Sequence, residues 1–86
     1  MSNQLFNRKQ ITCIYFTSVD QKINLPILCI KTDIFAQIEE KLYQKYPEYR
    51  ETNNYFIANG KHILGFGAVE ENNIQEGQGV QLVKLD

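Results

Sequence analysis

The sequence predicts an α+β fold in which one helix covers one face of a mixed β-sheet. Its 86 residues are enough for a single domain with a single core, and too few for two domains. Several short segments are rich in β-branched and aromatic residues and are separated by turn-forming residues. One longer segment has helical periodicity. Together these observations predict four to five strands and one main helix.

The first two strands are expected to form a hairpin. The segments are "ITCIYFT" at 11–17 and "INLPILCI" at 23–30, and the polar stretch "SVDQK" between them favours the turn. Pro26 lies in the middle of the second segment and has no N–H to donate to a neighbouring strand. The second strand is therefore expected at a sheet edge.

Two cysteines, Cys13 and Cys29, occur at a spacing that fits neither a metal clip nor a redox motif. In the expected hairpin register Cys13 lies opposite about Leu25, which leaves Cys29 beyond reach of a disulfide. We expect two buried free thiols.

A helix is expected over about 33–46. Its apolar positions recur at helical spacing and are Ile34, Phe35, Ile38, Leu42 and Tyr46. Thr32 or Asp33 offers an oxygen for the N-cap, and Pro47 should end the helix.

The C-terminal half of the sequence predicts three more strands. The third runs over 55–58, and Asn59-Gly60 then supplies the two residues that a type I′ hairpin turn favours. A short fourth strand is expected at 62–64, the "GFG" at 65–67 is expected to be a loop, and the last strand should begin at Gly79.

Charge and hydropathy exclude several classes of function. Nine basic and ten acidic residues give a formal charge of -1, with no basic segment suited to nucleic acid. Apolar runs are only a few residues long, so no membrane insertion is expected. The first ten residues lack the apolar region of a secretory signal. We expect an intracellular, cytoplasmic protein, with a mitochondrial or other organellar assembly left open.

No motif predicts an enzyme, a cofactor site or a metal site. His62 has no nearby Cys or Asp in a ligand or triad pattern. "GFG" lacks the lysine, the Ser/Thr and the long helix of a phosphate loop, and "EENNIQEG" lacks the carboxylate spacing of a calcium loop. Ser2 and Ser18 lie in no nucleophile motif.

The chain resembles ubiquitin-like proteins. From Phe56 onward it aligns on the C-terminal half of ubiquitin without a gap, and the similarity extends more weakly over the hairpin and the helix start. The identical positions are Ile57, Gly60, Lys61, Asn73, Ile74, Gln75, Leu82 and Val83. The resemblance implies a β-grasp roll over 11–86, preceded by an extension at 1–10. The sequence ends at "VKLD" without the Gly-Gly of a conjugated modifier.

The alternation that this resemblance implies divides the apolar residues between two faces of the sheet. The face toward the helix is expected to carry Ile11, Cys13, Tyr15, Ile23, Leu25, Ile27, Phe56, Val80 and Leu82, with Val69 and Ile74 completing the core. The opposite face is expected to carry an interaction site made of Ile14, Phe16, Leu28, Ile57, Gln81, Val83 and Leu85, with Pro26 beside them. In ubiquitin-like proteins this face holds the recognition patch; Ile57 and Val83 match its two central members, and Gln81 replaces the histidine between them.

The surplus of apolar residues on that face indicates protein–protein interaction. The sequence favours an accessory or structural subunit of a multi-subunit assembly. One alternative is a reversible adaptor that docks onto a ubiquitin receptor or a proteostasis component. Another is a modifier processed from a longer precursor.

Overall fold

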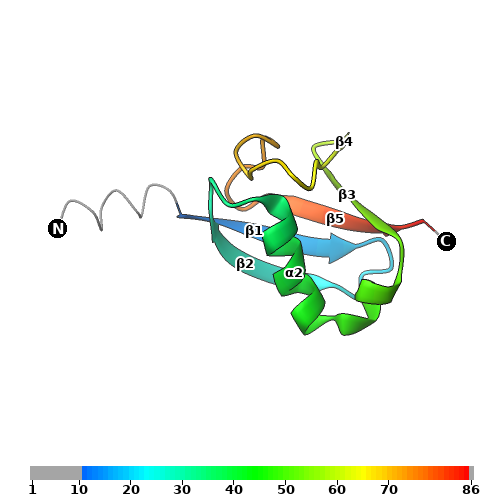
Figure 1. Cartoon of the computed structure of the whole chain (residues 1–86). Helices are drawn as coiled ribbons and strands as arrows, with labels where there is room; N and C mark the ends of the chain where they lie inside the picture. The colour runs from blue at the N-terminus through cyan, green and yellow to red at the C-terminus, as the bar shows by residue number, and fades with distance from the viewer. Residues whose placement is uncertain (1–10, 86) are drawn as a thin grey trace, which may run out of the picture.

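The computed structural model describes residues 11–85, which form a five-stranded sheet with one α-helix across one face (Figure 1). Residues 1–10, where the sequence predicts an extension, lie outside the described part. The elements are β1 (Ile11–Ser18), β2 (Asn24–Ile30), α2 (Phe35–Lys45), the 3-10 helix η1 (Pro47–Glu51), β3 (Asn54–Ala58), β4 (Lys61–His62) and β5 (Gly79–Lys84).

The sheet is mixed and has the order β2-β1-β5-β3-β4. The neighbouring strands β1 and β5 run parallel, and the other pairs are antiparallel. The expected α+β class with a mixed sheet and one main helix is confirmed. The edge position of β2, inferred from Pro26, is confirmed as well.

The β1–β2 hairpin has a different register from the expected one. Cys13 pairs with Leu28 rather than Leu25, a shift of three residues. The connecting loop is longer than a tight turn because Ser18 organises it: its hydroxyl accepts from the Ile23 N–H at 3.0 Å and donates to Asp20 at 2.6 Å. A shift by an odd number of residues moves every side chain of a strand to the other face. The expected facing of β1 was therefore wrong.

The residues of β1 that face the helix are Thr12, Ile14, Phe16 and Ser18, all buried. Phe16 is fully buried and makes edge-to-face contacts with Phe35 of α2 and Phe56 of β3, with ring centroids 5.9 and 5.6 Å apart. The rings of Phe35 and Phe56 lie 5.2 Å apart. These three rings tie β1, β3 and the helix together at the centre of the core.

The rest of the core largely matches the expectation. Ile23, Ile27, Phe56, Val69, Ile74, Val80 and Leu82 are buried as expected, together with Ile38 and Leu42 of the helix. Ile14, expected on the opposite face, is buried as well. Leu25 is half-buried and packs against the core. Ile11 and Tyr15, expected inside, are 43% and 40% exposed on the other face, and Cys13 is only half-buried there.

The two thiols are free, but not for the expected reason. Cys13 pairs with Leu28 and points away from the helix, whereas Cys29 pairs with Thr12 and is buried beneath it. The two side chains therefore lie on opposite faces of the hairpin, which prevents a disulfide.

The helix ends where Pro47 predicts, but it begins differently. Its N-cap residue is Ile34, without a side-chain cap, so the expected capping by Thr32 or Asp33 was wrong. Asp33 instead accepts a hydrogen bond from the Ile30 N–H at 2.9 Å. The expected type I′ turn is confirmed, since Asn59 and Gly60 have φ of 55° and 73°.

Candidate protein-interaction face

The side of the sheet away from α2 is called the outer sheet face. Its side chains come from all five strands, because every second residue of a strand points the same way. They are Ile11, Cys13, Tyr15 and Thr17 of β1, Pro26, Leu28 and Ile30 of β2, Tyr55 and Ile57 of β3, His62 of β4, and Gln81 and Val83 of β5, followed by Leu85.

Strand pairing gathers these residues into two clusters. At the β1–β2 end, Ile11 lies beside Ile30 and Cys13 beside Leu28. Leu28 is 69% exposed and Ile30 43%, which is unusual for large aliphatic side chains in a sheet. At the β3–β5 end, Tyr55 lies beside Val83.

The β3–β5 cluster also contains the molecule's histidine. Ile57 pairs with both Gln81 and His62, and the imidazole of His62 stacks on the Tyr55 ring with centroids 4.7 Å apart and planes 3° apart. This stack extends the apolar surface beside Ile57. His62 is exposed, and its imidazole packs on this aromatic ring.

Five of the seven expected site residues do lie on the outer sheet face. They are Leu28, Ile57, Gln81, Val83 and Leu85. Ile14 and Phe16 do not, because both point toward the helix and are fully buried. Their places are taken by Ile11 and Tyr15, and Ile30 extends the β2 side. Predicting which of these β1 residues face outward would have required the correct register of the β1–β2 hairpin.

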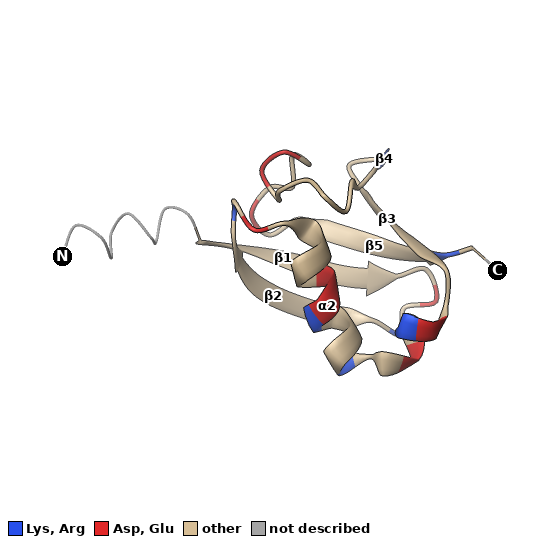
Figure 2. Ribbon diagram, viewed as in Figure 1, with Lys and Arg blue, Asp and Glu red and all other residues tan. Residues whose placement is uncertain are grey.

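The outer sheet face carries no charged side chain in the strands that the structure describes. Only two strand residues are charged, and both alternate toward the helix side: Lys61 pairs with the buried Ala58, and Lys84 places its Nζ 6.0 Å from the centre of the Tyr49 ring. Figure 2 shows the charges on the helices, the loops and the strand ends. Such a surface suits an apolar partner.

Comparison with known proteins supports the fold and nothing finer. The sequence matches no protein-family model and no curated protein. Among solved structures, a protein designed de novo on the basis of ubiquitin superposes with a TM-score of 0.75 over 90% of this chain and 92% of that one. The chain has a ubiquitin-like β-grasp fold. The two sequences are 19% identical, so the likeness concerns the fold alone.

The β2 edge of this ubiquitin-like β-grasp is poorly suited to adding a strand. Pro26 has no N–H, and the N–H and C=O of Ile30 are both bonded to Asp33, at 2.9 and 2.8 Å. Between Pro26 and Ile30, only the N–H of Leu28 remains as a donor on this edge of β2. Blocked edges of this kind disfavour strand pairing with another chain.

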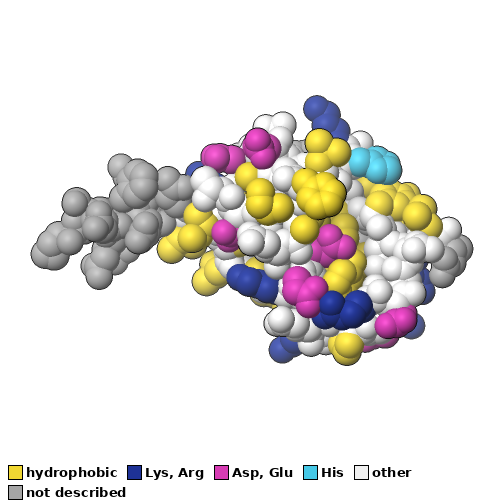
Figure 3. All heavy atoms as spheres, viewed as in Figure 1, with side chains coloured by type: hydrophobic (Ala, Val, Ile, Leu, Met, Phe, Trp, Pro, Cys, Tyr) yellow, Lys and Arg dark blue, Asp and Glu magenta, His cyan; other side chains and the backbone are white. Residues whose placement is uncertain are grey.

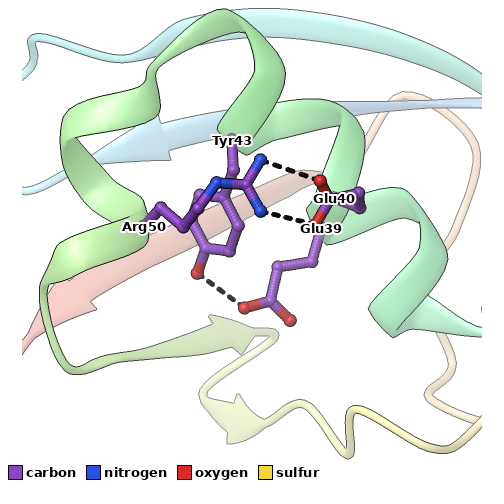
Figure 4. Close-up of polar contacts among 4 residues, drawn as sticks. All are labelled: Glu39, Glu40, Tyr43 and Arg50. Atoms are coloured by element: carbon purple, nitrogen blue, oxygen red, sulfur yellow. Dashed lines mark hydrogen bonds and ion pairs between the residues drawn. The ribbon is translucent and has the colours of Figure 1, made fainter.

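A polar network on the helix side has a structural role (Figure 4). The Tyr43 hydroxyl donates to Glu39 at 2.6 Å and accepts from the Asn54 side chain at 3.2 Å. The Arg50 guanidinium makes two bonds to Glu40, at 2.9 and 2.8 Å, and lies 5.6 Å from the centre of the Tyr43 ring. Desolvation, helped by the bond to Glu39, raises the pKa of Tyr43 to about 12. The network joins α2 to η1 and β3.

Within residues 11–85, no group of three His, Cys, Asp or Glu side chains is placed to hold a metal ion. Neither helix of the described part has the length and apolarity needed to cross a lipid bilayer.

Proposed function

We propose that this chain is a non-catalytic ubiquitin-like protein that acts by protein–protein interaction through the outer sheet face, as an accessory or structural subunit of a larger assembly. One observation carries the proposal: apolar residues from four strands, β1, β2, β3 and β5, form an outer face without charged side chains among the described strands. Sheets with one face in water usually alternate apolar and polar residues. On β1 and β2, by contrast, the side chains that point away from the helix are largely apolar too.

The composition of the face favours a lasting contact over a transient one. Permanent interfaces are larger and more apolar than transient ones. Burying several hundred Å² of this surface is worth several kcal/mol at about 25 cal/mol per Å², before the costs of association. Leu28, Leu85, Ile11 and Ile30 supply much of the exposed apolar surface.

A partner of the β3–β5 cluster alone would fit the reversible adaptor. Ile57 and Val83 are half-buried, so this cluster exposes less of its aliphatic surface than the β1–β2 cluster does. A subunit interface would use both clusters, and an adaptor only the second. The two functions therefore differ in their response to a change at Leu28.

The test is native affinity purification of the full chain with Leu28→Asp, and with Val19→Asp as the matched control. Val19 is an apolar residue that is 66% exposed, close to Leu28 in exposure, but it lies in the loop between β1 and β2, outside the β1–β2 cluster. We expect Leu28→Asp to lose proteins that co-purify at fixed stoichiometry, while Val19→Asp keeps them. Both variants should retain the far-UV circular dichroism of the unmodified chain.

Salt provides a second readout. An apolar contact should survive washing with about 0.5 M NaCl, since screening weakens only charge–charge attraction. Retention of all partners by Leu28→Asp would refute the subunit role. Loss on Ile57→Asp but not on Leu28→Asp would indicate the adaptor instead.

A further inference from the structure

The turn Leu64–Gly67 displays an aromatic side chain that the fold does not use. The Gly67 N–H donates to the Leu64 C=O at 3.0 Å and closes the turn. Phe66, near its tip, is 93% exposed, and Leu64 is 70% exposed. This pair, which we call the Phe66 knob, belongs to neither cluster of the outer sheet face.

The turn is held in place by a side chain from a following segment. The Asn72 carboxamide accepts from the Leu64 N–H at 2.8 Å and donates to the Leu64 and Ala68 carbonyls at 3.0 and 3.2 Å. Glu71 adds a bond from the Ala68 N–H at 2.7 Å. A side chain at position 67 would crowd this arrangement, because a Cβ there would lie 3.2 Å from the Asn72 amide nitrogen.

The turn is also fastened to the start of α2. The N–H groups of Phe35 and Ala36 donate to the carbonyls of Gly67 and Gly65, at 3.0 and 2.9 Å. These bonds satisfy helix amides that lack a partner within the helix. They place the Phe66 knob on the helix side, the side seen in Figure 3, where apolar side chains reach the surface near the histidine.

Capping the helix uses backbone carbonyls and does not require any side chain at position 66. An exposed phenylalanine gains no burial, yet here it stands on a turn ordered by several hydrogen bonds. Aromatic side chains on ordered loops are typical anchors of protein interfaces, because little conformational entropy is lost when they bind.

The surroundings of the Phe66 knob indicate the chemistry of its partner. A shallow hollow beside it is lined by Leu64, Gly65, Phe66, Gly67, Glu71 and Asn72, of which Glu71 is the charged member. The segment 63–76 contains three glutamates, Glu70, Glu71 and Glu76, and no lysine or arginine. A complementary surface would be apolar at its centre and basic at its rim.

We propose that the Phe66 knob is a second protein-docking site, in which Phe66 inserts into an apolar pocket of a partner protein with a basic rim. The Phe66 knob is bonded to the start of α2 and belongs to neither cluster of the outer sheet face. The contact is therefore additional to the proposed function and independent of it.

The first test places a photo-crosslinking phenylalanine analogue at position 66 of the full chain in its native cells, with the same analogue at Val19 as control. We expect a discrete cross-linked protein from position 66 and none from position 19. A cross-linked dimer of this chain would overturn the proposal, as would equal products from both positions or no product from position 66.

The second test uses the purified cross-linked protein in calorimetric titrations. Phe66→Ala should raise the dissociation constant at least tenfold and leave the melting temperature of the chain unchanged. Glu71→Gln keeps an oxygen to accept from the Ala68 N–H but removes the charge, so it should weaken binding severalfold and reduce its dependence on salt. Unchanged affinity of Phe66→Ala, or a fall in its melting temperature, would refute the role of Phe66 as the anchor of the contact. Unchanged salt dependence of binding by Glu71→Gln would refute a basic rim on the partner.

Discussion

The facing of β1 can be tested by truncating two adjacent residues, Phe16 and Tyr15. Phe16 is fully buried between the rings of Phe35 and Phe56. Phe16→Ala removes this burial and leaves a cavity, so it should lower the free energy of unfolding by about 3 to 5 kcal/mol. Tyr15 is 40% exposed on the outer sheet face, and Tyr15→Ala should cost less than about 1 kcal/mol.

These magnitudes are large for a chain of this size. A domain of 86 residues is expected to have a free energy of unfolding of about 4 to 13 kcal/mol. Phe16→Ala therefore removes a large share of it and can prevent folding. Phe16→Leu, which keeps most of the volume, should cost about 1 to 2 kcal/mol and keeps the comparison measurable.

Urea denaturation followed by far-UV circular dichroism is the suitable assay, since the sequence contains no tryptophan. Equal denaturant slopes for all variants would show that the changes act on the native state. The reasoning is refuted if Tyr15→Ala destabilises the chain more than Phe16→Leu does. That order would mean that β1 faces the helix with its other alternation, as the sequence suggested.

Three further predictions follow from the described contacts. Asn72→Ala removes the three bonds that order the turn before Ala68; it should cost about 1 to 3 kcal/mol and speed amide hydrogen exchange there while leaving β1 protected. Pro26→Thr combined with Asp33→Ala restores edge donors on β2, and we expect concentration-dependent self-association in light scattering that neither single change causes to the same extent. The folded-state pKa of Tyr43, raised to about 12 from an ordinary 10, means that the folded state binds more protons than the unfolded state between these values. Its contribution to stability is complete below pH 10 and is lost as pH rises toward 12; Tyr43→Phe should remove this part of the alkaline loss, and equal alkaline profiles for both proteins would contradict the assignment.

Local patterns predicted the elements well. The helix follows from apolar residues at helical spacing, its end from Pro47, and the β3–β4 turn from Asn59-Gly60. The edge position of β2 follows from one missing N–H at Pro26. Each of these features depends on chemistry within a few neighbouring residues, which a single sequence displays.

The outer sheet face was predicted correctly for strands in which apolar and polar residues clearly alternate. It was predicted wrongly for β1, in which they do not. On β1, apolar residues occupy both alternations, and the buried one includes the polar Thr12 and Ser18. Hydrophobic pattern therefore could not choose between Phe16 and Tyr15 for the core. The choice depended on a loop whose length is set by hydrogen bonds of Ser18.

The sequence by itself determined the α+β class, the helix and the edge strand. The tertiary structure alone decided which face of β1 is buried, because this depends on strand register and on whether Phe16 can meet Phe35 and Phe56 across the core. It also decided that Phe66 is exposed, since the bonds that hold its turn come from Asn72 and the start of α2. Contacts between distant residues leave no periodic trace in a chain, and both surfaces that we propose for binding depend on them.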